Sequence, residues 1–240
     1  MDRQPLGKGI FINVSKNHTF GTDAVLLANF ASSKRFKKHC DLGAGCGIIS
    51  MLLLKDGTVQ NSVGVEISEE AVALATKTAC EFAKDTFTPI NADLKSLKGV
   101  LPFGVFDLVT CNPPYKAEGA GILSTGDKDI VARHETMCTL EDVISAASHL
   151  VKSSGSFCIC QRPERLADIL CLMRKYKLEA KRVRTVSKKV GEEPWLVLVE
   201  GRRDAKSGIR ILPPLFVYDN NGNLSSEMLE IYGDYKEGHL

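Results

Sequence analysis

The sequence has no long hydrophobic run, since no stretch approaches the ~20 apolar residues that a membrane-spanning helix needs. Its N-terminus lacks the basic start and apolar middle of a secretory signal peptide. A large excess of one charge is also missing, because the 240 residues have a formal net charge of +2. We therefore expect a cytoplasmic protein with no membrane attachment, and the overall charge does not identify a partner.

Paired cysteine motifs are missing as well, although the chain contains 8 cysteines. There is no Cys-x-x-Cys pair. Cys158 and Cys160 alternate within a strand-like run, and Cys80 and Cys171 lie in helix-like stretches. In a cytoplasmic chain such cysteines are expected to be free buried thiols, not disulfides or zinc ligands. We accordingly predict no metal site.

The sequence does contain a regular alternation of short apolar runs with amphipathic stretches. Strands are predicted at 37–42, 62–67, 86–94, 105–111 and 156–161, and two final strands at 179–189 and 193–203 are close enough to pair antiparallel. Helices are predicted at 47–56, 68–85, 139–155 and 163–177, with Ser68 and Thr139 as N-caps and Gly155 closing the third helix. This order predicts an α/β fold with a doubly wound, seven-stranded, mostly parallel sheet and an antiparallel last strand.

Ligands of such sheets bind beyond the carboxyl ends of the strands. The first strand ends in "DLGAGCG", where Gly43, Gly45 and Gly47 follow Asp41. The Asp41 carboxylate would repel a pyrophosphate and attract an ammonium or sulfonium group. S-adenosylmethionine has such cationic groups and no phosphate. Its carboxylate could meet the backbone of residues 45–47 and the N-terminus of the following helix.

Acidic residues also end the next two strands. Glu66 follows Gly47 by 19 residues, a distance at which an acid accepts hydrogen bonds from ribose hydroxyls. Asp93 could accept a hydrogen bond from the amino group of a cofactor adenine. Each motif alone has a structural explanation, either a tight turn or a solvated charge. Their occurrence on successive strand ends favours a nucleoside-containing cofactor.

The fourth strand is followed by "CNPPYK", in which Pro113 and Pro114 stop the strand. The flanking residues suggest chemistry at this point. The Asn112 side-chain oxygen and the Pro113 carbonyl could each accept one N–H of a planar amine, such as that of adenine. This would aim the nitrogen lone pair at a methyl donor without a strong base. Tyr115 offers a flat face on which an extruded base could stack.

The ordered motifs "DLGAGCG", "GVEIS", "NAD" and "NPPY" resemble those of class I methyltransferases that act on planar amide or amine nitrogens. The segments "HTFGTDAVLLANF", "ARHETMCTLEDVISAASHL", "RPERLADILCLMRK" and "GIRILPPLFVYDNNGNLSSEMLEIYG" resemble the tRNA (adenine-N6)-methyltransferase family, which includes a bacterial enzyme for valine tRNA. The likeness extends over nearly all of the chain from about Phe20. It implies a Rossmann-like sheet, S-adenosylmethionine as cofactor and adenine N6 in RNA, tRNA in particular, as the methyl acceptor.

The resemblance also assigns residues. The catalytic residues it implies are Asn112, Pro113, Pro114 and Tyr115. The cofactor-binding residues it implies are Thr22, Asp23, Asp41, Gly43, Gly45, Gly47, Glu66, Ile67, Asp93, Leu94 and Asn112. We expect a single methyltransferase domain over 1–240, with an N-terminal extension and cofactor-side helix at 1–36, a catalytic core at 37–201 and a C-terminal extension at 202–240.

The core motifs are shared with DNA adenine and protein glutamine methyltransferases, so these substrates are alternatives. A non-catalytic RNA- or partner-binding protein on the same fold is an alternative of another class. Eight basic residues and one acid between Arg174 and Lys189 predict contact with RNA phosphates, together with the loop after Tyr115. The alternative for this segment is a charged edge strand. For the triplet Arg133-His134-Glu135 we favour a structural ion pair over an acid–base group, because methyl transfer to an amine leaves a base little to do.

Overall fold

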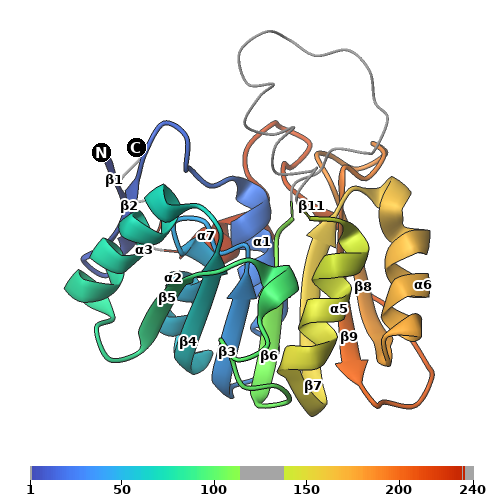
Figure 1. Ribbon diagram of the computed structural model, residues 1–240. Helices are drawn as coiled ribbons and strands as arrows, with labels where there is room; N and C mark the ends of the chain where they lie inside the picture. The colour runs from blue at the N-terminus through green and yellow to red at the C-terminus, as the bar shows by residue number, and fades with distance from the viewer. Residues whose placement is uncertain (1, 114–137, 234, 236–240) are drawn as a thin grey trace, which may run out of the picture.

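The computed structural model describes residues 2–113, 138–233 and 235. Figure 1 shows one twisted sheet with helices on both faces, as predicted for a doubly wound α/β fold. The strand order is β10-β8-β9-β7-β6-β3-β4-β5, and β11 also pairs with β8. Two hydrophobic clusters, one on each face of the sheet, form the core.

The strands of the main sheet are β3 (Phe36–Leu42), β4 (Val59–Glu66), β5 (Phe87–Asn91), β6 (Phe106–Cys111), β7 (Val151–Gln161), β8 (Leu178–Ser187), β9 (Leu196–Arg203), β10 (Arg210–Ile211) and β11 (Leu215–Phe216). The seven predicted strands correspond to β3 to β9. Of these, β9 is antiparallel to both of its neighbours, as predicted for the last strand. The described sheet nevertheless has nine strands, because the two-residue strands β10 and β11 extend it beyond β8.

The helices are α1 (Thr22–Ala31), α2 (Ile48–Lys55), α3 (Glu69–Phe82), α5 (Leu140–Leu150), α6 (Leu166–Lys175) and α7 (Ser226–Tyr232), with 3₁₀ turns η1 (Leu94–Ser96) and η2 (Pro163–Arg165). The predicted N-caps are present. The Ser68 hydroxyl accepts from the Ala71 amide at the start of α3. Thr139 and Asp142 form a capping box at the start of α5.

The prediction for the end of α5 was wrong, because the helix stops at Leu150 and β7 begins at the next residue. Here β7 makes an irregular turn, in which the register with β6 shifts between the pairs Phe106–Val151 and Leu108–Ser156. A Cβ at Gly155 would lie 2.6 Å from Val151 Cγ2 and 2.9 Å from the Lys152 carbonyl oxygen. The lack of a side chain at Gly155 therefore lets the backbone of β7 pass close to Val151 and Lys152, and Gly155 does not end a helix.

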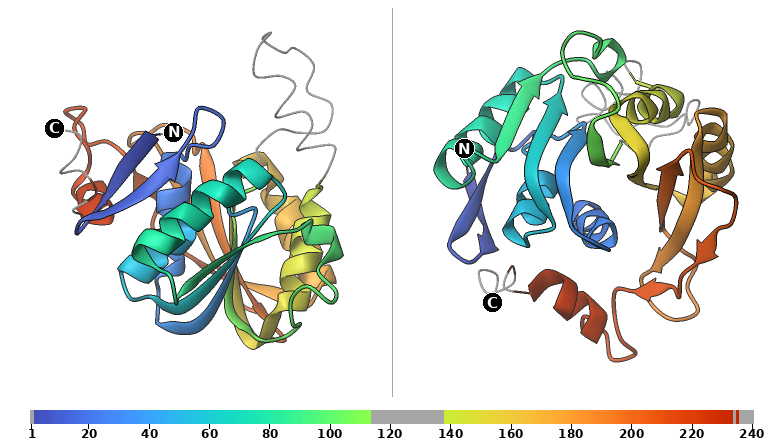
Figure 2. Two further views of the ribbon diagram at one scale, coloured as in Figure 1. Left: turned by 60° about the vertical axis from the view of Figure 1, so that its left-hand side comes forward. Right: turned by 90° about the horizontal axis from the view of Figure 1, so that it is seen from below.

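Both ends of the chain form structure that the sequence analysis did not predict as strands or helices. The hairpin of β1 (Asp2–Gly7) and β2 (Ile10–Val14) packs on α3, where the Asn13 amide donates to Thr78 Oγ1 at 3.0 Å. Helix α7 packs near α1, and Thr22 Oγ1 lies 3.0 Å from the Tyr232 hydroxyl. The hairpin, α1 and α7 lie on one side of the sheet, whereas α5 and α6 lie on the other (Figure 2).

All 8 cysteines are free, as predicted. Cys158 and Cys160 are buried in β7. The prediction of burial was wrong for Cys80 on α3 and Cys171 on α6, which are exposed. Each of them lies on the outward face of its helix. The apolar character of a thiol predicts burial and does not indicate which face of the helix the residue occupies.

Glu200 on β9 is a buried acidic residue that forms ion pairs, and only 1% of its side chain is exposed. Its carboxylate pairs with Arg182 and accepts from Arg202 Nε at 3.2 Å and Ser156 Oγ at 2.8 Å. Burial acts to raise the pKa of Glu200. The hydrogen bonds and positive charges of Arg182 and its neighbours outweigh burial, so the pKa lies below its usual value.

We expect Glu200→Gln to lower the free energy of unfolding by about 3–5 kcal/mol, because it leaves the largely buried Arg182 guanidinium without its counter-charge. The effect should diminish as the pH falls and the wild-type carboxylate is protonated. Urea denaturation at neutral and acidic pH measures both. The control is Glu81→Gln, which removes the more exposed pair with Arg3 and should cost less than about 1 kcal/mol. Equal effects of the two substitutions would contradict this account.

Candidate active site

The ends of β3, β4, β5 and β6 lie at one edge of the sheet, which we call the carboxyl edge. These strands are parallel, with Leu42 paired to Val65 and Cys111, and Glu66 paired to Asn91. The loops that follow the strands therefore meet at this edge, at the top of Figure 1. The predicted residues Asp41, Gly43, Glu66, Asp93 and Asn112 come from these strand ends and loops.

The glycine loop contains two kinds of glycine. All three have positive φ, at 69° for Gly43, 54° for Gly45 and 90° for Gly47. A Cβ at Gly43 or Gly45 would meet no atom within 4 Å, so the backbone there faces open space. A Cβ at Gly47 would lie 2.7 Å from Phe87 Cε1. The first two glycines can therefore admit a ligand, whereas the third is required by the packing of the N-terminus of α2 against β5.

Glu66 connects the glycine loop to the start of α3. Its Oε2 accepts from the Gly45 amide and its Oε1 accepts from the Ser68 amide, each at 2.9 Å. Each carboxylate oxygen has two lone pairs, so the group can still accept hydrogen bonds from ribose hydroxyls. These two backbone contacts fix the position of the carboxylate.

Asn91, which the sequence analysis missed, ties the second strand end to the third. Its amide donates to the carbonyl oxygens of Glu66 at 3.1 Å and Ile67 at 3.0 Å. Asp93 lies just beyond and caps η1, where its Oδ1 accepts from the Lys95 amide at 2.9 Å. Leu94 begins that turn. The predicted residues Ile67, Asp93 and Leu94 are thus neighbours on the loops beside Glu66.

Asp41 lies in an unusual electrostatic environment, because it is only 1% exposed. Its Oδ1 accepts from the Thr110 hydroxyl at 2.6 Å, and its Oδ2 has no hydrogen-bond partner among the described residues. Burial raises the pKa of Asp41 to about 7, the Thr110 hydrogen bond opposes this, and the charge of Glu66 adds to it. The sequence analysis treated Asp41 as a fixed charge, but in the folded protein the group is poised between its two protonation states.

Asn112 is held on two sides. Its Nδ2 donates to Asp23 Oδ2 at 3.0 Å, and its Oδ1 accepts from the Cys160 thiol at 3.0 Å. A carboxylate can only accept, so Asp23 fixes which end of the amide faces α1. The structure thus brings the predicted residues Thr22 and Asp23, at the start of α1, next to the end of β6. The hydrogen bond between Cys160 and Asn112 could not be predicted from the strand-like run that contains Cys160.

Several predicted residues lie outside the described part of the chain. Pro113 is described and buried. Pro114, Tyr115, the loop that follows Tyr115 and the triplet Arg133-His134-Glu135 belong to residues 114–137 and lie outside it. Their roles remain predictions.

Four of the eight basic residues in the segment from Arg174 to Lys189 pair with acids. Arg174 pairs with Glu179, Lys175 with Glu141, Arg182 with Glu200 and Arg184 with Glu227. Because β8 is antiparallel to β9, and β9 to β7, β8 runs in the direction of the parallel strands. Only its end, followed by the exposed Lys188 and Lys189, reaches the carboxyl edge. The segment as a whole is therefore not one basic surface.

No group of three or more His, Cys, Asp or Glu side chains that could hold a metal ion occurs within residues 2–113, 138–233 and 235. Over the same residues, no helix has the length and apolar character to span a membrane.

A doubly wound sheet with a glycine loop and acids on successive strand ends defines a nucleoside-binding α/β protein. The family model for the methyltransferase small domain matches residues 9–176, so the chain belongs to that family. The predicted fold and methyltransferase class are thereby confirmed, with S-adenosylmethionine as the methyl donor.

Within that family, the chain is similar to relatives named tRNA1(Val) (adenine(37)-N6)-methyltransferase. The one from Porphyromonas gingivalis is 30% identical over 191 residues, which are 76% of this chain and 73% of the relative. The one from Bacteroides thetaiotaomicron is 28% identical over 213 residues, which are 87% and 81% of the two chains.

Solved structures with the same fold are more distant in sequence. A predicted O-methyltransferase from Agrobacterium tumefaciens superposes with a TM-score of 0.70 at 20% identity, covering 89% of this chain and 96% of that chain. A ribosomal protein L11 methylase from Lactobacillus delbrueckii has a TM-score of 0.51 at 19% identity and covers 75% and 77%. These likenesses establish the Rossmann-like fold.

We expect Asp41→Asn to stabilise the protein increasingly as the pH rises. The pKa of Asp41 is about 7 in the folded protein and 3.8 as its ordinary value. Between these values the folded state binds more protons than the unfolded state, so wild-type stability falls with rising pH. The variant has no carboxyl group at this position and does not lose stability in this way. Its free energy of unfolding relative to wild type should therefore rise by about 4 kcal/mol between pH 4 and pH 8. Denaturation across this range measures it, and a difference that does not change with pH would refute the assignment.

Proposed function

We propose that the protein transfers a methyl group from S-adenosylmethionine to the N6 amino group of an adenine in RNA, and in tRNA in particular. The position of Asn112 carries this proposal. Asp23 and Cys160 hold its amide at the end of β6, on the same edge as the glycine loop and Glu66. The similarity to relatives named tRNA1(Val) (adenine(37)-N6)-methyltransferase supports tRNA as the substrate.

The residues of the carboxyl edge fit the cofactor. Asp41 has one oxygen without a partner among the described residues, which suits a cationic ligand. Gly43 and Gly45 leave open space beside the backbone, and Glu66 retains lone pairs for ribose hydroxyls. When bound, S-adenosylmethionine supplies an electrophilic methyl group on a sulfonium. We assign the adenine of the cofactor to Asp93, flanked by Leu94 and Ile67, and one side of the site to Thr22 and Asp23.

The methyl acceptor is assigned to the motif after β6. Asn112 Oδ1 and the Pro113 carbonyl oxygen accept the two N–H groups of the amine, so that its lone pair points to the methyl donor. Cys160 does not prevent this, because a thiol is a weak donor and the amide oxygen has a second lone pair. Pro113 and Pro114 bring no N–H groups that would compete. Tyr115 is the stacking face for the base.

The substrate class is tested by incubating the protein with labelled S-adenosylmethionine and with total tRNA, DNA or protein from the same cells. We expect label in tRNA, and mass spectrometry of the digested nucleosides should identify N6-methyladenosine. Label only in DNA or only in protein would replace the RNA proposal by the corresponding alternative. If calorimetry detects no binding of S-adenosylmethionine, the non-catalytic alternative is favoured.

We expect Asn112→Ala to lower kcat at least about a hundredfold, because the amine loses one of its two acceptors. Cofactor affinity, measured by calorimetry, should stay within a few fold. The matched control is Asn61→Ala, at an exposed position of β4 remote from the carboxyl edge, which should behave as wild type. Retained activity of Asn112→Ala would refute the role assigned to this residue.

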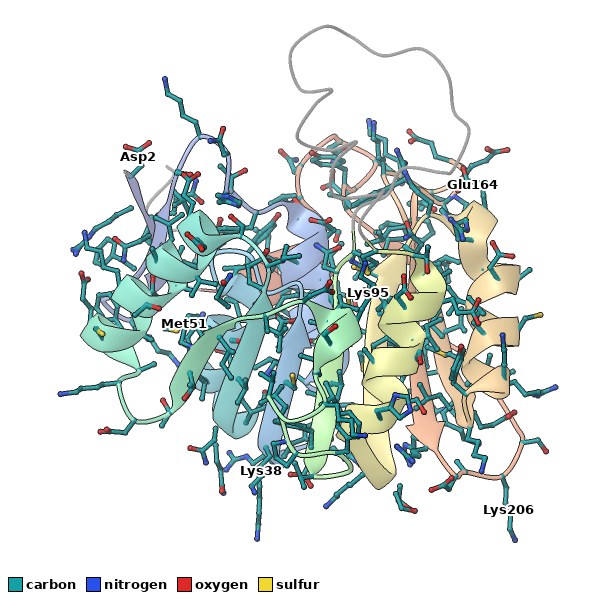
Figure 3. All side chains as sticks on the ribbon, viewed as in Figure 1. Asp2, Lys38, Met51, Lys95, Glu164 and Lys206 are labelled. Carbon is teal, nitrogen blue, oxygen red and sulfur yellow. The ribbon has the colours of Figure 1, made fainter. Side chains whose placement is uncertain are left out.

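We infer that RNA contact, where it involves β8, comes from its carboxyl end. The double variant Lys188→Glu/Lys189→Glu should weaken tRNA affinity about tenfold or more and reduce its salt dependence. The matched control, Lys37→Glu/Lys38→Glu, changes two consecutive exposed lysines at the opposite edge, where Figure 3 shows Lys38. Filter binding at several salt concentrations measures both. If the two variants lose affinity equally, the contact is not specific to the carboxyl edge.

A further inference from the structure

A row of five buried polar side chains runs through the core beneath the glycine loop. The row consists of Ser50 on α2, Ser62 on β4, His39 on β3, Thr110 on β6 and Asp41 on β3. Its successive contacts are Ser50 Oγ to Ser62 Oγ at 2.8 Å, Ser62 Oγ to His39 Nδ1 at 2.8 Å, His39 Nε2 to Thr110 Oγ1 at 2.8 Å, and Thr110 Oγ1 to Asp41 Oδ1 at 2.6 Å. No member is more than 2% exposed.

His39 is the centre of this row, and the methyl-transfer chemistry does not use it. Its imidazole reaches both strands that flank β3, with Ser62 on one side and Thr110 on the other. Burial lowers the pKa of His39 to about 3, so the ring is neutral at physiological pH. A neutral imidazole carries one proton, so it donates from one nitrogen and accepts at the other. The tautomer of the ring therefore depends on which of its two neighbours donates to it and which accepts from it.

When Asp41 is ionised, the direction of the row is fixed from its carboxylate. A carboxylate only accepts hydrogen bonds, so the Thr110 hydroxyl must donate its single hydrogen to Asp41 Oδ1. The Thr110 oxygen is then an acceptor for His39. The imidazole proton must therefore be on Nε2, and Nδ1 accepts from the Ser62 hydroxyl.

When Asp41 is protonated, the direction reverses. A proton on Oδ1 can be donated to Thr110, whereas a proton on Oδ2 would face no partner among the described residues. Thr110 then donates to His39 Nε2. The imidazole proton must be on Nδ1, from which it is donated to Ser62, and Ser62 donates to Ser50. Going from this state to the ionised one releases one proton to solvent and moves the imidazole proton to Nε2.

We propose that His39 is a positioning residue whose tautomer is coupled through Thr110 to the charge of Asp41, so that cofactor binding at the carboxyl edge sets the state of the whole row. The final part rests on the proposed function, since it requires a cationic cofactor near Asp41. The coupling of the tautomer to the charge of Asp41 is a property of the protein alone.

The other titratable groups near Asp41 do not replace it in this role. Glu66 on β4 is held by the amides of Gly45 and Ser68. The thiols of Cys40, Cys46 and Cys111 also feel the charge of Asp41. Burial raises the pKa of each above its usual value, so all three stay protonated. Among the described residues that contact His39 itself, Ser62 and Thr110 carry no charge.

The coupling is tested by nitrogen-15 NMR of the imidazoles in the ligand-free, full-length protein, with no substitution in the measured sample. At about pH 5.5 we expect the Nδ1–H tautomer of His39, and at about pH 8.5 the Nε2–H tautomer. The signals are assigned by their loss in His39→Gln, or by the absence of an imidazolium form above pH 5. The same tautomer at both pH values would overturn the proposal, as would an imidazolium at neutral pH.

The link through Thr110 is tested with two variants. S-adenosylhomocysteine carries the ammonium group and cannot transfer a methyl group. When it is added at about pH 6.5, we expect wild-type His39 to shift to the Nε2–H tautomer. The affinity of the protein for S-adenosylhomocysteine should weaken about tenfold per pH unit below pH 7. Thr110→Val should abolish the pH-dependent tautomer change, and Thr110→Ser should restore it. If Thr110 acts only in packing, Thr110→Val lowers the melting temperature but leaves the tautomer change intact, which refutes the coupling.

These results separate the two proposals. A tautomer that follows pH in a protein that methylates no tRNA would support the coupling and refute the proposed function. A fixed tautomer in a protein that methylates tRNA would refute the coupling and support the proposed function.

Discussion

The parallel hydrogen-bond register of β3 with β4 and β6 is the constraint on which the rest of the molecule depends. It places Asp41 beside Gly64 on one neighbour and Thr110 on the other, and it brings three strand ends to one edge. Gly64 matters here, because a Cβ at that position would lie 2.9 Å from the Ala44 Cβ and 3.1 Å from Phe87. The strand next to the glycine loop must therefore lack a side chain where the loop passes over it.

The same register explains why the site combines rigid and adjustable parts. Glu66 is fixed by backbone amides, whose positions follow from the loop and from the start of α3. Asp41 is fixed by a hydroxyl, which can rotate and can donate or accept. A group held by amides keeps one role, whereas a group held by hydroxyls can exchange its proton without moving its heavy atoms.

Much of the fold could be predicted from the sequence because local signals agreed with the tertiary structure. Ser68 and Thr139 cap the helices that they were expected to cap, and the strand ends carry the expected acids. The boundary between α5 and β7 could not be predicted, because the glycine that looked like a helix stop is needed by packing against Val151. The hairpin β1–β2 was missed because its short strands gain their stability from α3, far along the chain.

The candidate site was predictable in its residues but not in its contacts. Asp23 and Asn112 are 89 positions apart, and the amide of one meets the carboxylate of the other only in the folded chain. The basic segment shows a second limit. Counting charges along the sequence does not reveal that Glu141, Glu200 and Glu227, which come from other elements, pair with three of its basic residues. Burial of Asp41, which changes its chemistry, has no signature in a one-dimensional pattern.

The C-terminal segment has a consequence for how the chain may be shortened. Strands β10 and β11 cover part of the outer edge of β8, whose unpaired backbone groups would otherwise be a template for another chain. The chain then crosses to α7, where the Tyr232 hydroxyl meets Thr22 at the start of α1. One C-terminal segment thus covers part of a sheet edge and contacts the helix whose Asp23 holds Asn112. Removing this segment would expose that edge of β8 and would take away a contact at the start of α1.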